Sequence, residues 1–130
     1  MRIPTAALAL CLAAAPALGQ PPSGVALFRQ TCATCHGLEA RGDGPMASIL
    51  TLAMPDLTLM AARNGGVFPL ARVVAAIDGR TELAGHGGPM PVYGFSLRGE
   101  GVALTAPDGA EIRTSAEIAA IADWLDSVQR

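Results

Sequence analysis

Two cysteines and a histidine lie within five consecutive residues, Cys32-Ala33-Thr34-Cys35-His36. This C-x-x-C-H pattern is the signature of covalent attachment of a c-type haem. Residues i and i+3 share one face of a helix, so both thiols can reach the two vinyl groups along one edge of the porphyrin. The histidine that follows is then placed to bind the iron as the proximal ligand. The pattern therefore predicts thioether bonds from Cys32 and Cys35 and an axial bond from His36.

The beginning of the chain has the pattern of a cleaved export signal. Arg2 supplies a positive charge, residues 6–15 are mostly apolar, and residues 17–19 (Ala-Leu-Gly) have the small-x-small pattern of a cleavage site. The apolar stretch is shorter than the roughly 20 residues that span a bilayer, and no later stretch is long enough either. We therefore expect residues 1–19 to be a signal peptide and residues 20–130 to form one domain, exported to a bacterial periplasm. An uncleaved N-terminal anchor is the alternative.

Cleavage would leave Cys32 and Cys35 as the only cysteines, because Cys11 lies inside the apolar stretch. A disulfide or a redox-active pair is the alternative use of these two thiols. A thioredoxin-like site needs a βαβ context, and the sequence shows none. The histidine directly after the second cysteine therefore favours haem attachment.

Charge and composition narrow the class of protein further. The formal net charge is −2, and the chain contains arginine but no lysine. A net acidic chain without basic runs argues against nucleic acid as a partner. Aromatic residues make up only 4 % of the 130 residues, so the core of a chain this small is modest. A buried haem would supply the missing apolar mass.

The elements that must position the motif are predicted to be short helices. Ser23 can cap a helix over residues 24–34, which delivers the two cysteines and the histidine. A shorter helix is expected over residues 57–63, closed by the Asn-Gly-Gly of residues 64–66. Another is expected from Pro69 to residue 78, with Val73, Val74 and Ile77 inward. The segment 80–101 is rich in glycine and proline and has no helical period, so it is predicted to be a loop.

The last stretch is the clearest helix of the chain. Thr114 and Glu117 are expected to form a capping box at its start. Apolar residues recur at helical spacing behind them: Ile118, Ile121, Ala122, Leu125 and Val128. Before this helix, a Pro-Asp-Gly turn within residues 102–112 allows a small hairpin. With no internal repeat and no second domain, the predicted fold class is all-α, with about four to five short helices and a possible hairpin.

A six-coordinate iron needs a second axial ligand, and methionine and histidine are the usual choices. Met46 follows the motif too closely to reach the far face of the haem, and Met60 lies in a helical stretch. Met90 lies in a glycine-rich loop between two prolines, which stiffen the backbone around its thioether. Met54 and His86 are the alternatives.

Three features together resemble a class I cytochrome c: the motif at residues 32–36, the later Met90-Pro91-Val92-Tyr93-Gly94, and the amphipathic C-terminal helix. The resemblance covers residues 23–128. It implies the cytochrome c fold, with short helices wrapped around one covalently attached haem and Met90 as the distal iron ligand. It also implies that the first and last helices cross closely at Gly24, beside Phe28 and Trp124.

The resemblance assigns further roles around the haem. The backbone carbonyl of Pro45 is expected to accept a hydrogen bond from the ring of His36. Apart from the resemblance, partly buried haem propionates need hydrogen-bond donors, and Tyr93 is expected to be one because it follows the ligand loop. Three arginines are weaker candidates for that second role and are more simply explained as solvated surface charges: Arg41, Arg63 and Arg80.

The function that the resemblance implies is electron transfer rather than catalysis, since His36 and Met90 leave no open iron position for a substrate. Expected partners are redox proteins: a membrane quinol-oxidising complex, a terminal oxidase, or a periplasmic dehydrogenase or reductase. The protein is expected to be a monomer. The alternatives are a dedicated haem subunit of a periplasmic oxidoreductase and a five-coordinate iron that binds peroxide or a gas. Residues 96–113 are expected to be a structural loop.

Overall fold

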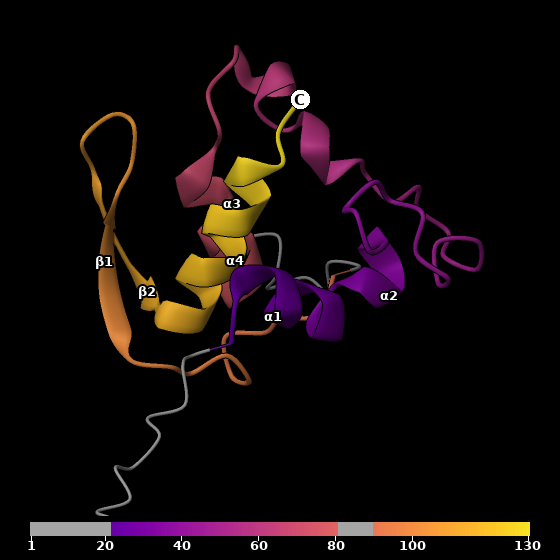
Figure 1. The fold of residues 1–130 in the computed structure, drawn as a ribbon, viewed down its shortest axis with the longest axis horizontal. Helices are drawn as coiled ribbons and strands as arrows, with labels where there is room; N and C mark the ends of the chain where they lie inside the picture. The colour runs from indigo at the N-terminus through magenta and orange to yellow at the C-terminus, as the bar shows by residue number, and fades with distance from the viewer. Residues whose placement is uncertain (1–21, 81–89) are drawn as a thin grey trace, which may run out of the picture.

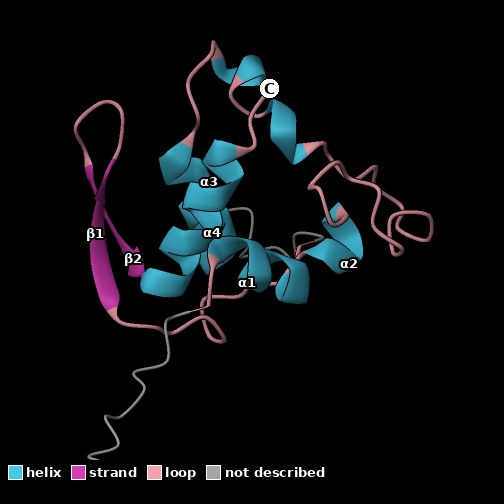
Figure 2. Ribbon diagram, in the orientation of Figure 1, coloured by secondary structure: helices cyan, strands magenta, loops and turns pink. Residues whose placement is uncertain are grey.

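A computed structural model of the chain describes residues 22–80 and 90–130. These residues form four α-helices, two 3-10 helices and one hairpin (Figure 1), in the order α1 (Gly24–Thr31), α2 (Ala33–His36), η1 (Leu57–Leu59), η2 (Ala62–Asn64), α3 (Leu70–Asp78), β1 (Gly101–Thr105), β2 (Glu111–Ser115) and α4 (Ala116–Ser127). The mostly helical architecture, with a hairpin before the last helix, confirms the predicted fold class (Figure 2). No helix in the described part of the chain is long and apolar enough to cross a membrane. The predicted signal peptide and His86 lie outside the described residues.

The first predicted helix is divided at Cys32. Ser23 caps α1 as expected, because its hydroxyl accepts a hydrogen bond from the amide of Ala26 at 3.4 Å. Cys32 then joins α1 to α2 with φ −113° and ψ −30°, away from ideal helical values. Helix α2 continues to His36 and ends at Gly37, whose φ is +80°. The haem motif therefore occupies the junction and the whole of the second, shorter helix.

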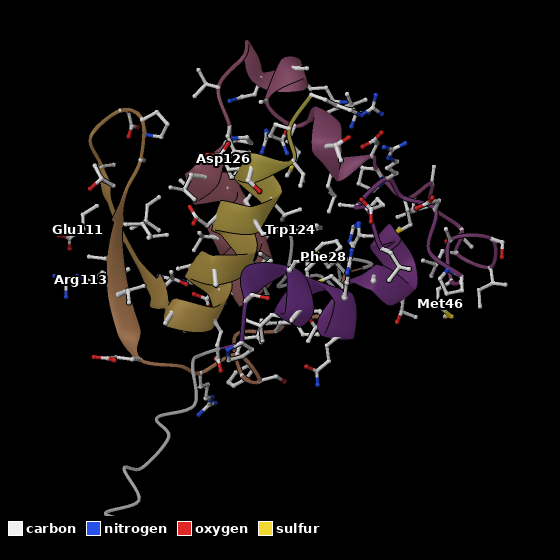
Figure 3. All side chains as sticks on the ribbon, in the orientation of Figure 1. Phe28, Met46, Glu111, Arg113, Trp124 and Asp126 are labelled. Atoms are coloured by element: carbon white, nitrogen blue, oxygen red, sulfur yellow. The ribbon has the colours of Figure 1, made fainter. Side chains whose placement is uncertain are left out.

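Helices α1 and α4 cross in close contact, as the resemblance implies. A Cβ added to Gly24 would lie 1.9 Å from the carbonyl oxygen of Ala120, so only glycine fits at this position. Beside the crossing, the rings of Phe28 and Trp124 pack with their centroids 4.5 Å apart (Figure 3). This contact joins the two ends of the described domain.

Replacing Gly24 by alanine is expected to push α1 and α4 apart. Overpacking of this kind costs about 1–3 kcal/mol of unfolding free energy. Urea denaturation of the haem-loaded protein measures the loss. Gly101→Ala is the matched control, since a Cβ added there meets no atom within 4 Å. If Gly24→Ala and Gly101→Ala had the same unfolding free energy, the two helices would be able to move apart without loss of stability.

The core lies between α1, α3 and α4. The inward positions predicted for α3 are confirmed, since Val73, Val74 and Ile77 are all buried. The apolar stripe of α4 is buried over Ile118, Ile121, Ala122 and Leu125, whereas Val128 is half-buried and lies beyond the last helical residue. The core is thus built by α1, α3 and α4.

The predicted capping box of α4 is wrong. The cap is Ser115, whose hydroxyl accepts a hydrogen bond from the amide of Ile118 at 3.2 Å. Thr114 belongs to β2, because the hairpin continues up to the residue before the helix. The carboxylate of Glu117 accepts a hydrogen bond from the amide of Gly99 at 2.6 Å instead of capping its own helix.

The hairpin pairs β1 and β2 antiparallel, from Gly101 opposite Ser115 to Thr105 opposite Glu111. It packs against α4 and lies on the side of that helix away from α2 (Figure 1). The guanidinium of Arg80 donates a hydrogen bond to the carbonyl of Arg113, which fastens the hairpin to the end of α3. The hairpin that the Pro-Asp-Gly turn allowed is thus present, and the segment 96–113 contains β1 and most of β2.

Residues 57–63 form two 3-10 helices, η1 and η2, in place of the one helix expected there. Asp56 caps the first of them: its carboxylate accepts hydrogen bonds from the amide of Thr58 at 2.9 Å and from the Thr58 hydroxyl. These bonds, with further ones from Arg130, hold the pKa of Asp56 below its usual range. Gly65, in the left-handed conformation, ends the second 3-10 helix as predicted.

Candidate functional site

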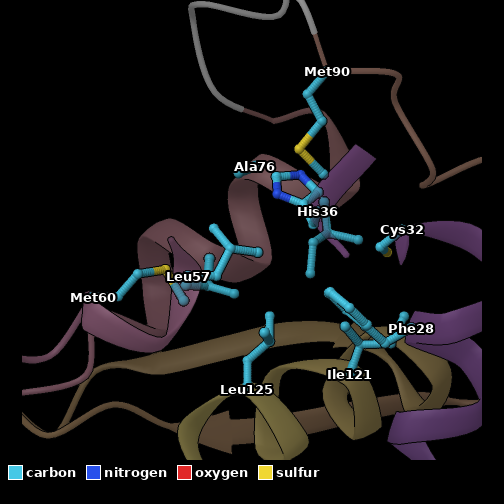
Figure 4. A pocket seen from close by; sticks show the side chains of 11 residues that line it. Phe28, Cys32, His36, Leu57, Met60, Ala76, Met90, Ile121 and Leu125 are labelled. Carbon is cyan, nitrogen blue, oxygen red and sulfur yellow. The ribbon is translucent and has the colours of Figure 1, made fainter. Parts of the chain in front are cut away.

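His36 and Met90 border the same apolar cavity. The cavity has two adjoining parts of about 80 and 250 Å³, both lined by Cys32, His36, Leu57 and Met90. Figure 4 shows the thioether of Met90 directed toward the His36 ring, with Phe28 of α1 and Ile121 and Leu125 of α4 below them.

The segment after the motif folds back onto α2 and holds it in place. The amide of Gly42 donates to the carbonyl of His36 at 2.8 Å, and the amide of Met46 donates to the carbonyl of Thr34 at 2.9 Å. These bonds satisfy carbonyls that the end of a helix leaves without partners. Gly44 allows the close approach, since a Cβ there would lie 2.6 Å from backbone oxygens of Ala33 and Cys35.

The two thiols of the motif are free and border the cavity. Cys32 is buried and Cys35 is half-buried, and both line the larger part of the cavity. Burial raises the pKa of the Cys32 thiol, although its hydrogen bond with the hydroxyl of Thr31 acts in the opposite direction. Both thiols are thus on the cavity side of the motif, where attachment to one edge of a haem requires them.

The ring of His36 carries a buried nitrogen without a partner. Its Nδ1 atom makes no hydrogen bond to any described residue. Leaving a buried polar group unpaired costs about 1–3 kcal/mol, so a further hydrogen-bond or metal partner for this ring would stabilise the site. Burial lowers the pKa of His36 and so favours the neutral imidazole, which is the form that binds metals. The residues present therefore fit a haem whose iron is bound by this ring.

The other methionines are less well placed than Met90. Met54 lines the larger part of the cavity and is still an alternative ligand. Met60 lines the smaller part, but Figure 4 shows it beside Leu57, away from the His36 ring. Met46 is exposed and lines neither part. Met90 lines both parts of the cavity and Met54 only one, and the choice of Met90 as the ligand stays a prediction.

Tyr93 fastens the Met90 loop to two helices. Its hydroxyl donates a hydrogen bond to the backbone carbonyl of Thr31 at 2.8 Å, and its amide donates to the carbonyl of Ile77 at 3.0 Å. Burial is the main cause that raises the pKa of this phenol, which keeps it protonated as a donor. Tyr93 also lines the larger part of the cavity, but its one O–H is donated to Thr31, so the expected hydrogen bond to a propionate stays a prediction.

The remaining candidates lie outside the cavity. Pro45 is exposed and borders a separate groove with Ala33 and Thr34, so its role as hydrogen-bond acceptor for His36 stays a prediction. Arg63 donates to the carbonyl of Asp56, and Arg80 pairs with Asp78. None of the three arginines suggested as propionate donors lines either part of the cavity.

Sequence reasoning missed the cavity wall opposite the motif. Leu57 lines both parts of the cavity, and Met60 and Ala76 line the smaller part. Their apolar character marks them only as core residues, and nothing in their spacing separates a residue that contacts a cofactor from one that contacts other side chains. The segment around η1 thus belongs to the site as much as the motif does.

Comparison with known proteins places the site in a family. A scan against models of protein families matches residues 23–129 with the family described as Cytochrome c. Comparisons with curated proteins and with solved structures give no match. The matched range contains the motif, the segment around η1 and the Met90 loop.

Proposed function

Because the chain belongs to the cytochrome c family, we propose that it is a monohaem electron carrier of a bacterial periplasm, with its iron bound by His36 and Met90. Family membership implies a covalent haem c and haem-based electron transfer. Proteins of this family are typically electron carriers rather than enzymes. The proposed iron ligands rest on the arrangement of the side chains at the cavity. The proposed location rests on the sequence of residues 1–19.

One observation carries the proposal: His36 and Met90 face each other at an apolar cavity that the two motif thiols also border. The haem, when bound, supplies reversible exchange of one electron. Cys32 and Cys35 would anchor it through thioether bonds, and the two axial side chains would leave no position for a substrate. The apolar lining excludes water from the site. Each of these contributions comes from residues that the fold brings together.

Two further residues complete the proposed site. The carbonyl of Pro45 would orient the His36 ring by accepting a hydrogen bond from its second nitrogen, the arrangement usual for a histidine that binds a metal. Tyr93 lines the larger part of the cavity, and it would donate to a propionate by exchanging its present hydrogen bond to the carbonyl of Thr31 for one to the haem. Residues 1–19 would direct export and then be removed.

Family membership implies redox proteins as partners. We propose a membrane quinol-oxidising complex, a terminal oxidase, or a periplasmic dehydrogenase or reductase, reached through small and transient interfaces. The chain has no lysine, so these partners are not bound through a ring of lysines. A free carrier of this kind is expected to be a monomer.

A dedicated haem subunit of a periplasmic oxidoreductase is the second candidate, and one observation favours it. The segment after α2 carries three exposed aliphatic side chains, Leu38, Ile49 and Leu52, with 53–71 % of their surface accessible. Permanent interfaces are more apolar than transient ones. Gel filtration of native extracts separates the two candidates, because a free carrier elutes near the mass of the monomer and a subunit elutes with its complex.

Potentiometric titration of the purified haem-loaded protein tests the function itself. We expect a single transition that follows the Nernst equation for one electron. The reduced protein is also expected not to bind carbon monoxide, since both axial positions are filled by side chains. Ready binding of carbon monoxide would instead show a five-coordinate iron and a gas-binding or peroxide-binding function.

A further inference from the structure

The hydrogen bonding of residues 57–61 is interrupted by a side chain from the other end of the domain. In an α-helix, the amide of residue 61 would donate to the carbonyl of residue 57. Here the amide of Ala61 donates to Oε1 of Gln129 at 2.8 Å, and Nε2 of Gln129 donates to the carbonyl of Leu57 at 2.9 Å. The side-chain amide of Gln129 thus stands between the two groups that a helix would join directly.

This insertion explains why the predicted helix is absent. A side chain inserted into the hydrogen-bond ladder opens a helix at that point. The chain accordingly forms η1 before the insertion and η2 after it. Gln129 is held firmly in this position, because its second amide hydrogen bonds to the carbonyl of Leu125 in α4 at 2.7 Å. Both donors of the side chain and its carbonyl oxygen therefore have partners.

Neighbouring bonds fix the same segment. The amide of Arg130 donates to the carbonyl of Thr58 at 3.0 Å, and its guanidinium donates to the Thr58 hydroxyl and to the carboxylate of Asp56, both at 2.9 Å. On the other side, the amide of Leu57 donates to the carbonyl of Ala40 at 2.8 Å. The segment is therefore held between the end of α4 and the loop that follows the haem motif.

The segment that Gln129 holds is a wall of the cavity. Leu57, whose carbonyl accepts from Gln129, lines both parts of the cavity, and Met60 lines the smaller part (Figure 4). A direct bond between residues 57 and 61 would wind this segment into a helical turn and redirect both side chains. The position of the wall is therefore coupled to one amide at the end of α4.

We propose that Gln129 is a positioning residue that sets the cavity wall at Leu57 and Met60 and thereby raises the reduction potential of the haem. The inference rests on the proposed function, in which this cavity holds the haem. Ferric haem carries one more positive charge than ferrous haem, so exclusion of water disfavours the ferric form. Solvent exposure is one of the factors by which a protein sets a haem potential. A wall that Gln129 holds closed therefore favours reduction.

The variant Gln129→Met tests the proposal, with Ser127→Ala as its matched control. Methionine has a similar length but makes none of the three hydrogen bonds. Ser127 lies near the same end of α4 and also bonds to a helix carbonyl, that of Trp124 at 2.6 Å, but the structure gives it no bond to the cavity wall. Both substitutions exchange neutral side chains, so neither changes the charge near the haem.

We expect Gln129→Met to lower the equilibrium constant for haem reduction by about threefold to tenfold, which for one electron is a fall of about 30 to 60 mV. The methyl resonances of Leu57 and Met60, shifted by the ring current of ferrous haem, should move as well. Ser127→Ala should leave the potential and these resonances unchanged, even if it lowers stability. If Gln129→Met kept the reduction potential of the wild type and the wild-type methyl resonances of Leu57 and Met60, the inference would be overturned.

Amide hydrogen exchange in the wild-type holoprotein tests the contact without any variant. The Ala61 amide should be protected, and exchange at the rate of an unbonded loop amide would overturn the inference even if Gln129→Met does not fold. If the wild-type protein carried no covalent haem, both the proposed function and this inference would be overturned. Normal haem loading with an unchanged potential in Gln129→Met would overturn the inference alone.

Discussion

Replacing Met90 by alanine is expected to remove the weak far-red absorption band of ferric haem that reports a bond between methionine sulfur and iron. Methionine ligation raises the potential of a haem. Loss of this ligand should therefore lower the midpoint potential, by on the order of 0.1 V within the roughly 0.8 V range that axial ligands control. Absorption spectra and potentiometric titration of the haem-loaded variant measure both effects.

Met54→Ala is the control for this prediction, because Met54 lines the same cavity and is the other methionine considered as a ligand. It should keep the far-red band and a potential close to that of the wild type. If Met90→Ala kept the band and a six-coordinate spectrum while Met54→Ala lost them, the distal ligand would be Met54. The two single variants thus assign the ligand whichever methionine it is.

Joint replacement of Cys32 and Cys35 by serine is expected to abolish covalent haem and leave a poorly folded chain. The cavity that these thiols border is lined largely by apolar side chains, and without its cofactor these surfaces have no partner that excludes water. The mass of the denatured protein reports the loss of the covalent group. Amide hydrogen exchange reports the loss of fold.

Thr34→Ser is the matched control, since Thr34 lies between the two cysteines and is exposed. It should retain covalent haem and the exchange protection of the wild type. A double serine variant with well-protected helices would show that the domain folds without its cofactor. The core formed by α1, α3 and α4 would then be sufficient on its own.

The features predicted correctly are those that short stretches of sequence encode. The cap at Ser23, the inward residues of α3 and the stripe of α4 follow from local spacing and capping chemistry. The fold around the motif then followed from resemblance to a family that the comparison confirms. Glycine at position 24 was explained in the same way, by a close helix crossing.

The features that sequence reasoning missed depend on contacts between distant residues. Residues 57–63 have the pattern of one helix, and only the amide of Gln129, 68 positions after Ala61, divides it. The Tyr93 hydroxyl bonds to a carbonyl 62 positions earlier. The cap of α4 shifted to Ser115 because strand pairing extended to that residue. No local pattern signals any of these three interactions.

The crossing of α1 and α4 also bears on the order of events during biogenesis. Gly24 and Ala120, which meet there, are 96 positions apart, so the core cannot close until nearly the whole chain is available. A chain that emerges N-terminal end first presents Cys32 and Cys35 long before α4 appears. Contacts between such distant residues also form slowly. The thiols are therefore accessible for the period in which the chain is still open, and closure of the last helix over the first ends that period.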